Sequence, residues 1–271
     1  MLKAQTADIS FTENDSLLLF SKNILTATAD SSRLKANDIF LKFFSDALHE
    51  HHNAKYSPDS LKMVSSLIPA DSSFRIHSWT LPLNNGTYRY YAIAEVFGKD
   101  NYRLSELIPK QGNPLSDMKV YRENEWYGAL YTGLIVTDWN KHKTYTLLGW
   151  DGRDARSNRK VIDIITITEN GAITFGQPVF KTPEGIKQRY ILDYAQNATV
   201  TLRYDYQTIM MPKGKRIKKV KDWMLVMDEL APLDPRMQGM KEYYVPTGTS
   251  YNAFAWMNGY WTFVENIKIG E

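Results

Sequence analysis

The chain has 271 residues, 43% of them hydrophobic and 23% charged, and its 33 basic side chains nearly balance 30 acidic ones. This composition is typical of a globular protein with a substantial core, and a net charge of +3 is too small to indicate a polyanion partner for the whole molecule. The lack of cysteine excludes disulfides, thiolate nucleophiles and thiolate metal sites, and no apolar run approaches the ~18 residues of a membrane span.

Residues 1–70 are predicted to form a helical segment. Apolar side chains recur at near-helical spacing over residues 17–25 and again over 34–48, which predicts two amphipathic helices. Ser57-Pro58 predicts the start of a third, short helix that stops at Pro69, because serine caps free amides and proline at the first helical position has no N–H to lose.

Residues 71–271 are predicted to be a β domain, because alternating patterns and turn signals replace the helical spacing. The most informative stretch is Tyr145–Phe180, which reads as three strands with Asn170-Gly171 between the last two. Both of these turn residues tolerate positive φ, and this makes Asn-Gly the strongest short hairpin signal. Residues 98–125 and 231–248 lack alternation and are predicted to be irregular. The predicted strands are 74–80, 87–97, 126–137, 143–150, 160–168, 172–180, 187–195, 199–211, 223–230, 251–257 and 260–269. Strands 187–195 and 199–211 are expected to form a hairpin that turns at Gln196-Asn197, and the last two a hairpin that turns at Asn258-Gly259.

About eleven strands joined mostly by short turns predict an α+β fold that is predominantly β. We expect the N-terminal helices to pack on a long antiparallel β-meander. Such a sheet must curl, form a sandwich or partly close, because open twisted sheets rarely exceed ~10 strands. No Pro/Gly/Ser-rich linker separates the helices from the strands, so one compact unit is expected.

Four short segments carry a resemblance to known proteins. They are LGWDG at 148–152, KVID at 160–163, FGQPVF at 175–180 and RYIL at 189–192. Over about residues 70–265 the chain resembles an uncharacterised family of exported β-rich bacterial proteins, from which no activity can be transferred. The resemblance implies a periplasmic or secreted protein whose signal peptide is absent from this sequence. A cytoplasmic protein is the alternative, because Met1–Thr6 lacks the apolar region of a signal peptide.

The central turn, Asp151–Lys160, packs six formal charges into ten residues. Its three arginines recur at every third residue, so a helical turn would align guanidiniums that suit phosphate or carboxylate. The alternative is a solvated turn whose aspartates and arginines pair with each other, and its spacing does not match an EF-hand loop. The candidate ligand-binding residues are Trp150, Asp151, Arg153, Asp154, Arg156 and Arg159.

A basic loop at 213–221 has six cations in nine residues. If all of them met phosphates, nucleic-acid binding would depend steeply on salt. No recognition helix, RNP-type motif or second basic patch accompanies the loop, which argues against nucleic acid and favours the charged end of a hairpin. The candidate anion-binding residues are Lys213, Lys215, Arg216 and Lys218.

The residues of other possible metal, cofactor and catalytic sites form only incomplete sets. His49 and His52 share a helix face, but a closed zinc site needs further ligands, and imidazoles near a helix C-terminus are favoured by the macrodipole alone. No G-x-G-x-x-G motif and no P-loop occurs, so we expect no metal and no cofactor. Candidates for a hydrolytic carboxylate pair are Glu95, Asp151, Asp205, Asp228 and Glu265. Candidates for sugar stacking are Trp139, Trp150, Tyr243, Tyr244, Trp256 and Trp261.

The leading hypothesis is a non-catalytic, exported binding or structural protein that contacts an envelope polysaccharide or a protein partner. It predicts an aromatic-lined groove. The runner-up is a glycan or ester hydrolase, which predicts two convergent carboxylates in a concave pocket. The third hypothesis, nucleic-acid binding through residues 213–221, predicts a continuous basic face.

Overall fold

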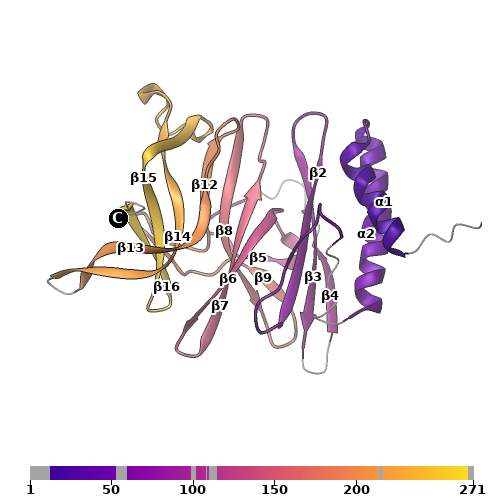
Figure 1. The fold of residues 1–271 in the computed structure, drawn as a ribbon, viewed down its shortest axis with the longest axis horizontal. Coiled ribbons are helices and arrows are strands. Elements are labelled where there is room, and N and C mark those ends of the chain that lie inside the picture. Colours follow the sequence, from indigo (N-terminus) through magenta and orange to yellow (C-terminus); the bar gives the residue numbers. More distant parts are fainter. Residues whose placement is uncertain are drawn as a thin grey trace, which may run out of the picture.

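The computed structural model describes residues 13–52, 60–98, 102–107, 109, 115–213 and 216–267. In the described residues two helices and three stacked sheets succeed one another along the long axis of the molecule, with the helices at one end and the C-terminal strands at the other (Figure 1). The predicted fold class, α+β and predominantly β, is therefore confirmed.

The helices α1 (Glu13–Thr26) and α2 (Asp30–Glu50) confirm the two predicted amphipathic helices. They cover one face of the first sheet (Figure 1). Phe40 and Phe44 of α2 meet the ring of Trp79 edge-on, with centroids 5.4 and 6.1 Å away. In the described part of the chain neither helix is both long and apolar enough to cross a membrane.

The first sheet, sheet A, has the strand order β1-β2-β3-β4. Its strands are β1 (Ser65–Leu67), β2 (Phe74–Pro82), β3 (Tyr88–Phe97) and β4 (Tyr102–Leu107). The predicted third helix is wrong where it can be compared, because Ser65–Leu67 pairs with the edge of β2 and tertiary pairing overrides local helical spacing. Residues 53–59, with the predicted cap, lie outside the described residues. The irregular segment predicted over 98–125 is also wrong at β4, which pairs with β3.

The second sheet, sheet B, has the order β5-β9-β8-β7-β6, and β12 also pairs with β8. Its strands are β5 (Tyr121–Arg122), β6 (Leu130–Trp139), β7 (His142–Asp151), β8 (Ser157–Ile167), β9 (Ile173–Phe175) and β12 (Tyr190–Ala195). Consecutive pairing of β7, β8 and β9 confirms the first two strands and the Asn170-Gly171 turn predicted over Tyr145–Phe180, with Gly171 at a φ of 80°, but the third strand is only three residues long. A short 3-10 turn, η1 (Glu123–Glu125), follows β5.

The third sheet, sheet C, has the order β11-β10-β16-β15-β14-β13. Its strands are β10 (Phe180–Thr182), β11 (Gly185–Lys187), β13 (Leu202–Lys213), β14 (Arg216–Pro232), β15 (Tyr244–Met257) and β16 (Tyr260–Ile267). The hairpin predicted at Asn258-Gly259 is confirmed. Two 3-10 turns, η2 (Pro235–Met237) and η3 (Lys241–Tyr243), precede β15.

Two predicted connections are wrong, and both errors concern the passage from sheet B to sheet C. The strand predicted over 172–180 is interrupted after Phe175, because Gly176 has a φ of 103°; the chain then enters sheet C, where β10 runs parallel to β16. The hairpin predicted between 187–195 and 199–211 does not form, because β12 pairs with β8 and β13 pairs with β14.

Each interface between layers holds its own hydrophobic core, because alternate residues of a strand point to opposite faces. In β2, Trp79 packs toward the helices and Ile76 toward sheet B. In β8, Ile165 packs toward sheet A and Ile164 toward sheet C. Sheet B is thus covered on both faces.

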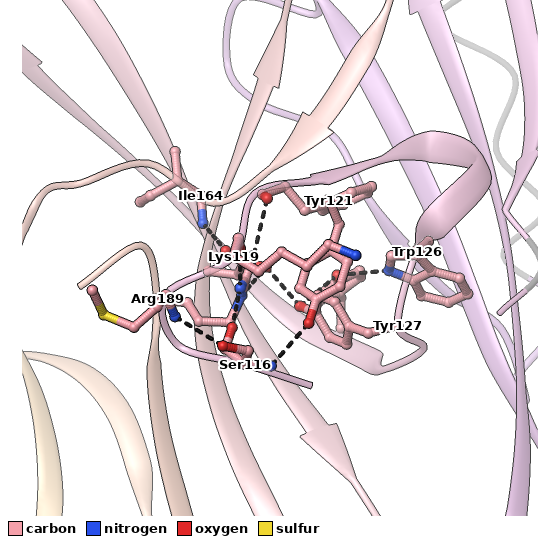
Figure 2. Close-up of polar contacts among 11 residues, drawn as sticks. Ser116, Lys119, Tyr121, Trp126, Tyr127, Ile164 and Arg189 are labelled. Carbon is pink, nitrogen blue, oxygen red and sulfur yellow. Dashed lines mark hydrogen bonds and ion pairs between the residues drawn. The ribbon is translucent and has the colours of Figure 1, made fainter. Parts of the chain in front are cut away.

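A buried ion pair anchors residues 115–127 to sheet B. Nε of Arg189 lies 3.0 Å from Oδ2 of Asp163, the Tyr127 hydroxyl donates to the same oxygen at 2.8 Å, and both charged side chains have no exposed area. The guanidinium reaches the loop carbonyls, as Figure 2 shows. Its carbonyl acceptors are Ser116, Lys119 and Phe175. Burial raises the pKa of the Asp163 carboxyl, and Arg189 opposes that shift.

Candidate functional site

The central turn is a tight bend between β7, which ends at Asp151, and β8, which begins at Ser157. One carboxylate oxygen of Asp154 accepts hydrogen bonds from the backbone amides of Arg156 and Ser157 at 2.8 and 2.9 Å. Burial opposes the shift, but these hydrogen bonds lower the pKa of the Asp154 carboxyl. The helical turn that would align three guanidiniums is therefore not formed.

The arginines of the central turn pair with carboxylates. Asp193 of β12 accepts from Arg159 at 2.6 Å and from Arg153 at 3.2 Å, and Arg159 also lies 3.6 Å from Asp151. Asp193 stands directly opposite Arg159 across the two strands. Arg156 is exposed and has no ion-pair partner among the described residues. The geometry therefore agrees with mutual pairing of the charges and leaves one guanidinium for an external anion.

The base of the turn is held against sheet A. The amide of Gly152 donates to the Tyr90 hydroxyl at 2.6 Å, and Trp150 packs edge-on against Tyr88 at 5.0 Å. Burial raises the pKa of the Asp151 carboxyl, although Arg159 opposes this shift. Trp150 and Asp151 thus have neighbours within the protein that account for their positions.

A cavity of about 460 Å³ adjoins the turn between β8, β11 and β12. Arg159 and Asp193 line it together with Lys187, which lies 3.0 Å from Asp117 and also contacts Glu184. Acidic and basic groups therefore compensate each other around this cavity, so it presents no concentrated charge to a ligand.

The predicted basic loop is mostly strand, which corrects the sequence prediction. β13 continues to Lys213 and β14 begins at Arg216, so the two strands form one long hairpin that projects from sheet C (Figure 1). This agrees with the charged hairpin end that was the alternative. Lys215 lies outside the described residues, as do the side chains of Lys213, Arg216 and Lys218. Two further lysines, Lys219 and Lys221, are exposed.

Three aromatic side chains lie side by side on this hairpin, and we call Tyr204, Tyr206 and Trp223 the aromatic shelf. Trp223 stands opposite Tyr206 in the register, and its ring lies 5.8 Å from that of Tyr206 and is stacked 5.3 Å from that of Tyr204. Tyr206 is 52% exposed and Trp223 49% exposed. Large apolar side chains that gather on a surface commonly mark a binding site.

The aromatic shelf shares its face with two cations. Side chains alternate along a strand, so Lys219 and Lys221 point to the same side of β14 as Trp223, at intervals of roughly 7 Å. Lys221 also stands opposite Thr208. This face can offer stacking surface, positive charge and a hydroxyl to one extended ligand.

Most of the predicted sugar-stacking side chains are buried, half-buried or hydrogen-bonded within the protein. Trp261 and Tyr244 are buried, and Trp256 donates to the Asp138 carbonyl at 3.1 Å. Trp150 and Tyr243 are half-buried, whereas Trp139 is 43% exposed at the end of β6. The sequence prediction missed Tyr206 and Trp223, although Tyr204 and Tyr206 alternate in a predicted strand.

The candidate carboxylates do not converge on one pocket. Glu95 belongs to sheet A, Asp151 to sheet B, and the remaining three to sheet C. Asp205 accepts from Arg203 at 3.0 Å, and Asp228 accepts from the Thr201 amide. None of the five lines the cavity beside the central turn.

The prediction that His49 and His52 share a helix face is wrong, because α2 ends at Glu50 and His52 lies beyond it, but both rings lie beside Tyr102. The rings of His49 and His52 lie 6.2 and 5.5 Å from that phenol ring. The described residues contain no group of three or more His, Asp or Glu side chains placed to hold a metal ion.

No relative of known function guides the interpretation of these residues. The chain matches no family model, no curated protein and no solved structure. We therefore infer function from the geometry of the chain itself.

Proposed function

We propose that the protein binds an acidic polysaccharide of the bacterial envelope on the aromatic shelf, without a chemical step. The observation that carries this proposal is the half-exposed, mutually packed pair Tyr206 and Trp223 beside Lys219 and Lys221. The C–H faces of sugar rings carry partial positive charge and suit the negative face of an aromatic ring. Lysine ammonium groups at regular spacing suit the acidic groups of such a polymer.

The rigidity of the aromatic shelf supports binding. Trp223 is fixed between two tyrosines, and the strands that hold it are paired over twelve residue pairs, so little conformational entropy remains to be lost when a ligand stacks. The aromatic shelf has three aromatic side chains, whereas a standard protein interface has ~20–30 residues on each side. A linear polymer therefore fits the shelf better than a folded protein partner does.

The envelope location rests on the resemblance to exported bacterial proteins. An exported protein would meet acidic polysaccharides directly, whereas a cytoplasmic protein would meet nucleic acid. Single-stranded nucleic acid is the second candidate ligand, because stacking aromatics beside cations also suit unpaired bases and phosphates. Fractionation of cells that produce the protein tests the location.

Binding to three polymers tests the ligand. We expect the protein to bind a polyuronate such as alginate more tightly than a neutral dextran or an oligothymidylate. Trp223→Ala should weaken alginate binding about 30-fold, because truncation of a central tryptophan commonly costs ~2 kcal/mol. The double variant Lys219→Gln, Lys221→Gln should also weaken alginate binding and make that binding less dependent on salt. Isothermal calorimetry at two ionic strengths measures both effects.

Tyr88→Ala is the matched control, since Tyr88 is an exposed aromatic residue of sheet A, outside the shelf. Its affinity for alginate should equal that of the wild type. Unchanged binding by Trp223→Ala would contradict the proposal. Preference for oligothymidylate, lost in the same variant, would replace it with the nucleic-acid hypothesis.

A further inference from the structure

A chain of hydrogen bonds crosses the helix-facing side of sheet A and ends at an exposed serine. Oγ of Ser66 lies 2.7 Å from Nδ1 of His77, and Nε2 of the same ring lies 2.9 Å from Oε2 of Glu95. Ser66 stands directly opposite His77 in the register of β1 and β2. His77 and Glu95 are 0% and 1% exposed, whereas Ser66 is exposed. We call these three residues the serine relay.

The partners of Glu95 determine the direction of these hydrogen bonds. Arg75 lies 3.5 Å from the Glu95 carboxylate and supplies the opposite charge, and the Tyr102 hydroxyl donates to its other oxygen at 3.0 Å. An ionised carboxylate only accepts hydrogen bonds, so Nε2 of His77 carries the ring proton. Nδ1 is then the acceptor and the Ser66 hydroxyl is the donor.

We propose that Ser66 is the nucleophile of a second, acyl-transferring site that hydrolyses esters, with His77 as its general base. Glu95 is a positioning residue, because it holds the tautomer and orientation of His77. A nucleophile, a base and a group that orients the base within hydrogen-bonding distance are the arrangement that serine catalysis requires. With the ring proton on Nε2, Nδ1 is the nitrogen that can take the proton of the Ser66 hydroxyl.

The chemical steps balance without a cofactor. Oγ of Ser66 attacks the ester carbonyl carbon while its proton passes to Nδ1 of His77. The carbon–oxygen bond to the alcohol breaks, and the leaving alcohol takes that proton. Water then attacks the acyl-serine, gives one proton to Nδ1, and the acid leaves as Ser66 regains its proton. The net reaction is ester plus water to acid plus alcohol.

The surroundings keep the base in the required state. Burial lowers the pKa of His77 below its ordinary value and Arg75 acts in the same direction, whereas Glu95 opposes them. The ring meets Phe44 of α2 edge-on at 5.1 Å, and His49 and His52 contact the phenol of Tyr102 at the far end of the network. The lowered pKa leaves Nδ1 unprotonated as an acceptor, and the Glu95 carboxylate favours the charged ring that forms when His77 takes a proton.

The position of Ser66 favours access by a substrate. A serine that only satisfied a buried histidine could itself be buried, but Ser66 is exposed. In the described residues β1 is the edge strand of sheet A.

A fluorophosphonate probe tests the site in the full-length protein, because it phosphonylates activated serines. We expect Ser66 to be modified at least about 100-fold faster than Ser65, in line with the usual gain from general-base assistance. The modified residue is identified by peptide mass spectrometry. The rate of p-nitrophenyl acetate turnover should also fall about 100-fold in Ser66→Ala.

Ser65→Ala is the matched control, because Ser65 lies next to Ser66 on the same short strand and points to the opposite face. It should be labelled like the wild type. Labelling of the wild type at Ser66 no faster than at Ser65 would overturn the proposal, as would equal turnover in Ser66→Ala. Both substituted serines lie on the edge strand β1, where we expect little effect on folding. A melting curve checks that each variant is folded.

Glu95→Gln separates positioning from a merely structural role. The glutamine amide can donate to Nε2 and so move the ring proton to Nδ1, which removes the acceptor for Ser66. The labelling rate should fall about tenfold or more while the variant stays folded. In the wild type the rate should rise with pH and level off below the ordinary histidine pKa of about 6.5. A folded Glu95→Gln variant that reacts at the wild-type rate would exclude the serine relay as a base system.

Discussion

We expect the buried ion pair of Asp163 and Arg189 to contribute more to the free energy of unfolding than the partly exposed ion pairs around the central turn. We expect Asp163→Asn to lower the free energy of unfolding by about 3–5 kcal/mol, because it leaves the guanidinium of Arg189 buried without its counter-charge. Denaturant unfolding measures the change. Asp193→Asn is the control: it removes a partner of Arg153 and Arg159 in a partly exposed site, and should cost about 1 kcal/mol or less. Similar losses in both variants would contradict the structural role given to Asp163.

Part of the candidate site could be predicted from local sequence. Arg153, Asp154 and Arg159 lie within ten consecutive residues, and the sequence predicts two alternatives for them: binding of an external anion, or pairing with each other. The partner Asp193 lies 34 residues beyond Arg159 and was not predicted, because the register of β8 against β12 is not encoded locally. Exposure of Trp223 was likewise not predictable, since it depends on how far the hairpin projects beyond the neighbouring sheet (Figure 1).

At the level of elements, hairpins were predicted correctly where two adjacent residues specify the turn. Asn170-Gly171 and Asn258-Gly259 give the required backbone geometry themselves. Gly176 has a different role, since it redirects the chain from sheet B to sheet C, and no short pattern distinguishes such a glycine from one within a strand. The short edge strands β1 and β4 were missed for a related reason: they form because a neighbour offers an unpaired edge.

Gly176→Ala tests the redirection of the chain. Its φ of 103° is unfavourable for alanine, and a Cβ there would lie 2.7 Å from a guanidinium nitrogen of Arg189 and 3.2 Å from the Lys119 carbonyl. We expect a loss of about 2–4 kcal/mol in the free energy of unfolding, the sum of backbone strain and disturbance of the buried ion pair.

Gly185→Ala is the matched control for that substitution. Gly185 has a φ of 123° but no heavy atom within 4 Å of the added Cβ. It should therefore show the backbone cost alone, about 1–2 kcal/mol. The difference between the two variants, measured by denaturant unfolding, reports the contact with Arg189. Equal losses would mean that the ion pair adapts to the extra carbon.

At the scale of the whole molecule, stacked sheets are held by cores between the layers and by a few polar links between them. One link joins sheets A and B: Asp71, just before β2, accepts from Lys143 at 2.6 Å and from the Tyr145 hydroxyl at 2.8 Å, both in β7. Ser73 donates to the same carboxylate at 2.8 Å. Burial opposes the shift, but these hydrogen bonds hold the pKa of Asp71 well below its ordinary value.

The Asp71 link makes stability depend on pH in a defined direction. A carboxyl whose pKa is lower in the folded state contributes its full stabilisation above its unfolded pKa, about 3.9, and loses it as the pH falls toward the folded value. Asp71→Asn should therefore lower the free energy of unfolding near pH 7 by roughly 1 kcal/mol, as for a partly exposed ion pair. Between about pH 4 and 2 the wild type should approach the variant. Urea unfolding at a series of pH values measures this convergence, with Asp46→Asn as the control because Asp46 pairs with Lys42 of the same helix, α2. A gap between wild type and Asp71→Asn that stayed constant down to pH 2 would show that the inter-sheet link does not depend on the charge of Asp71.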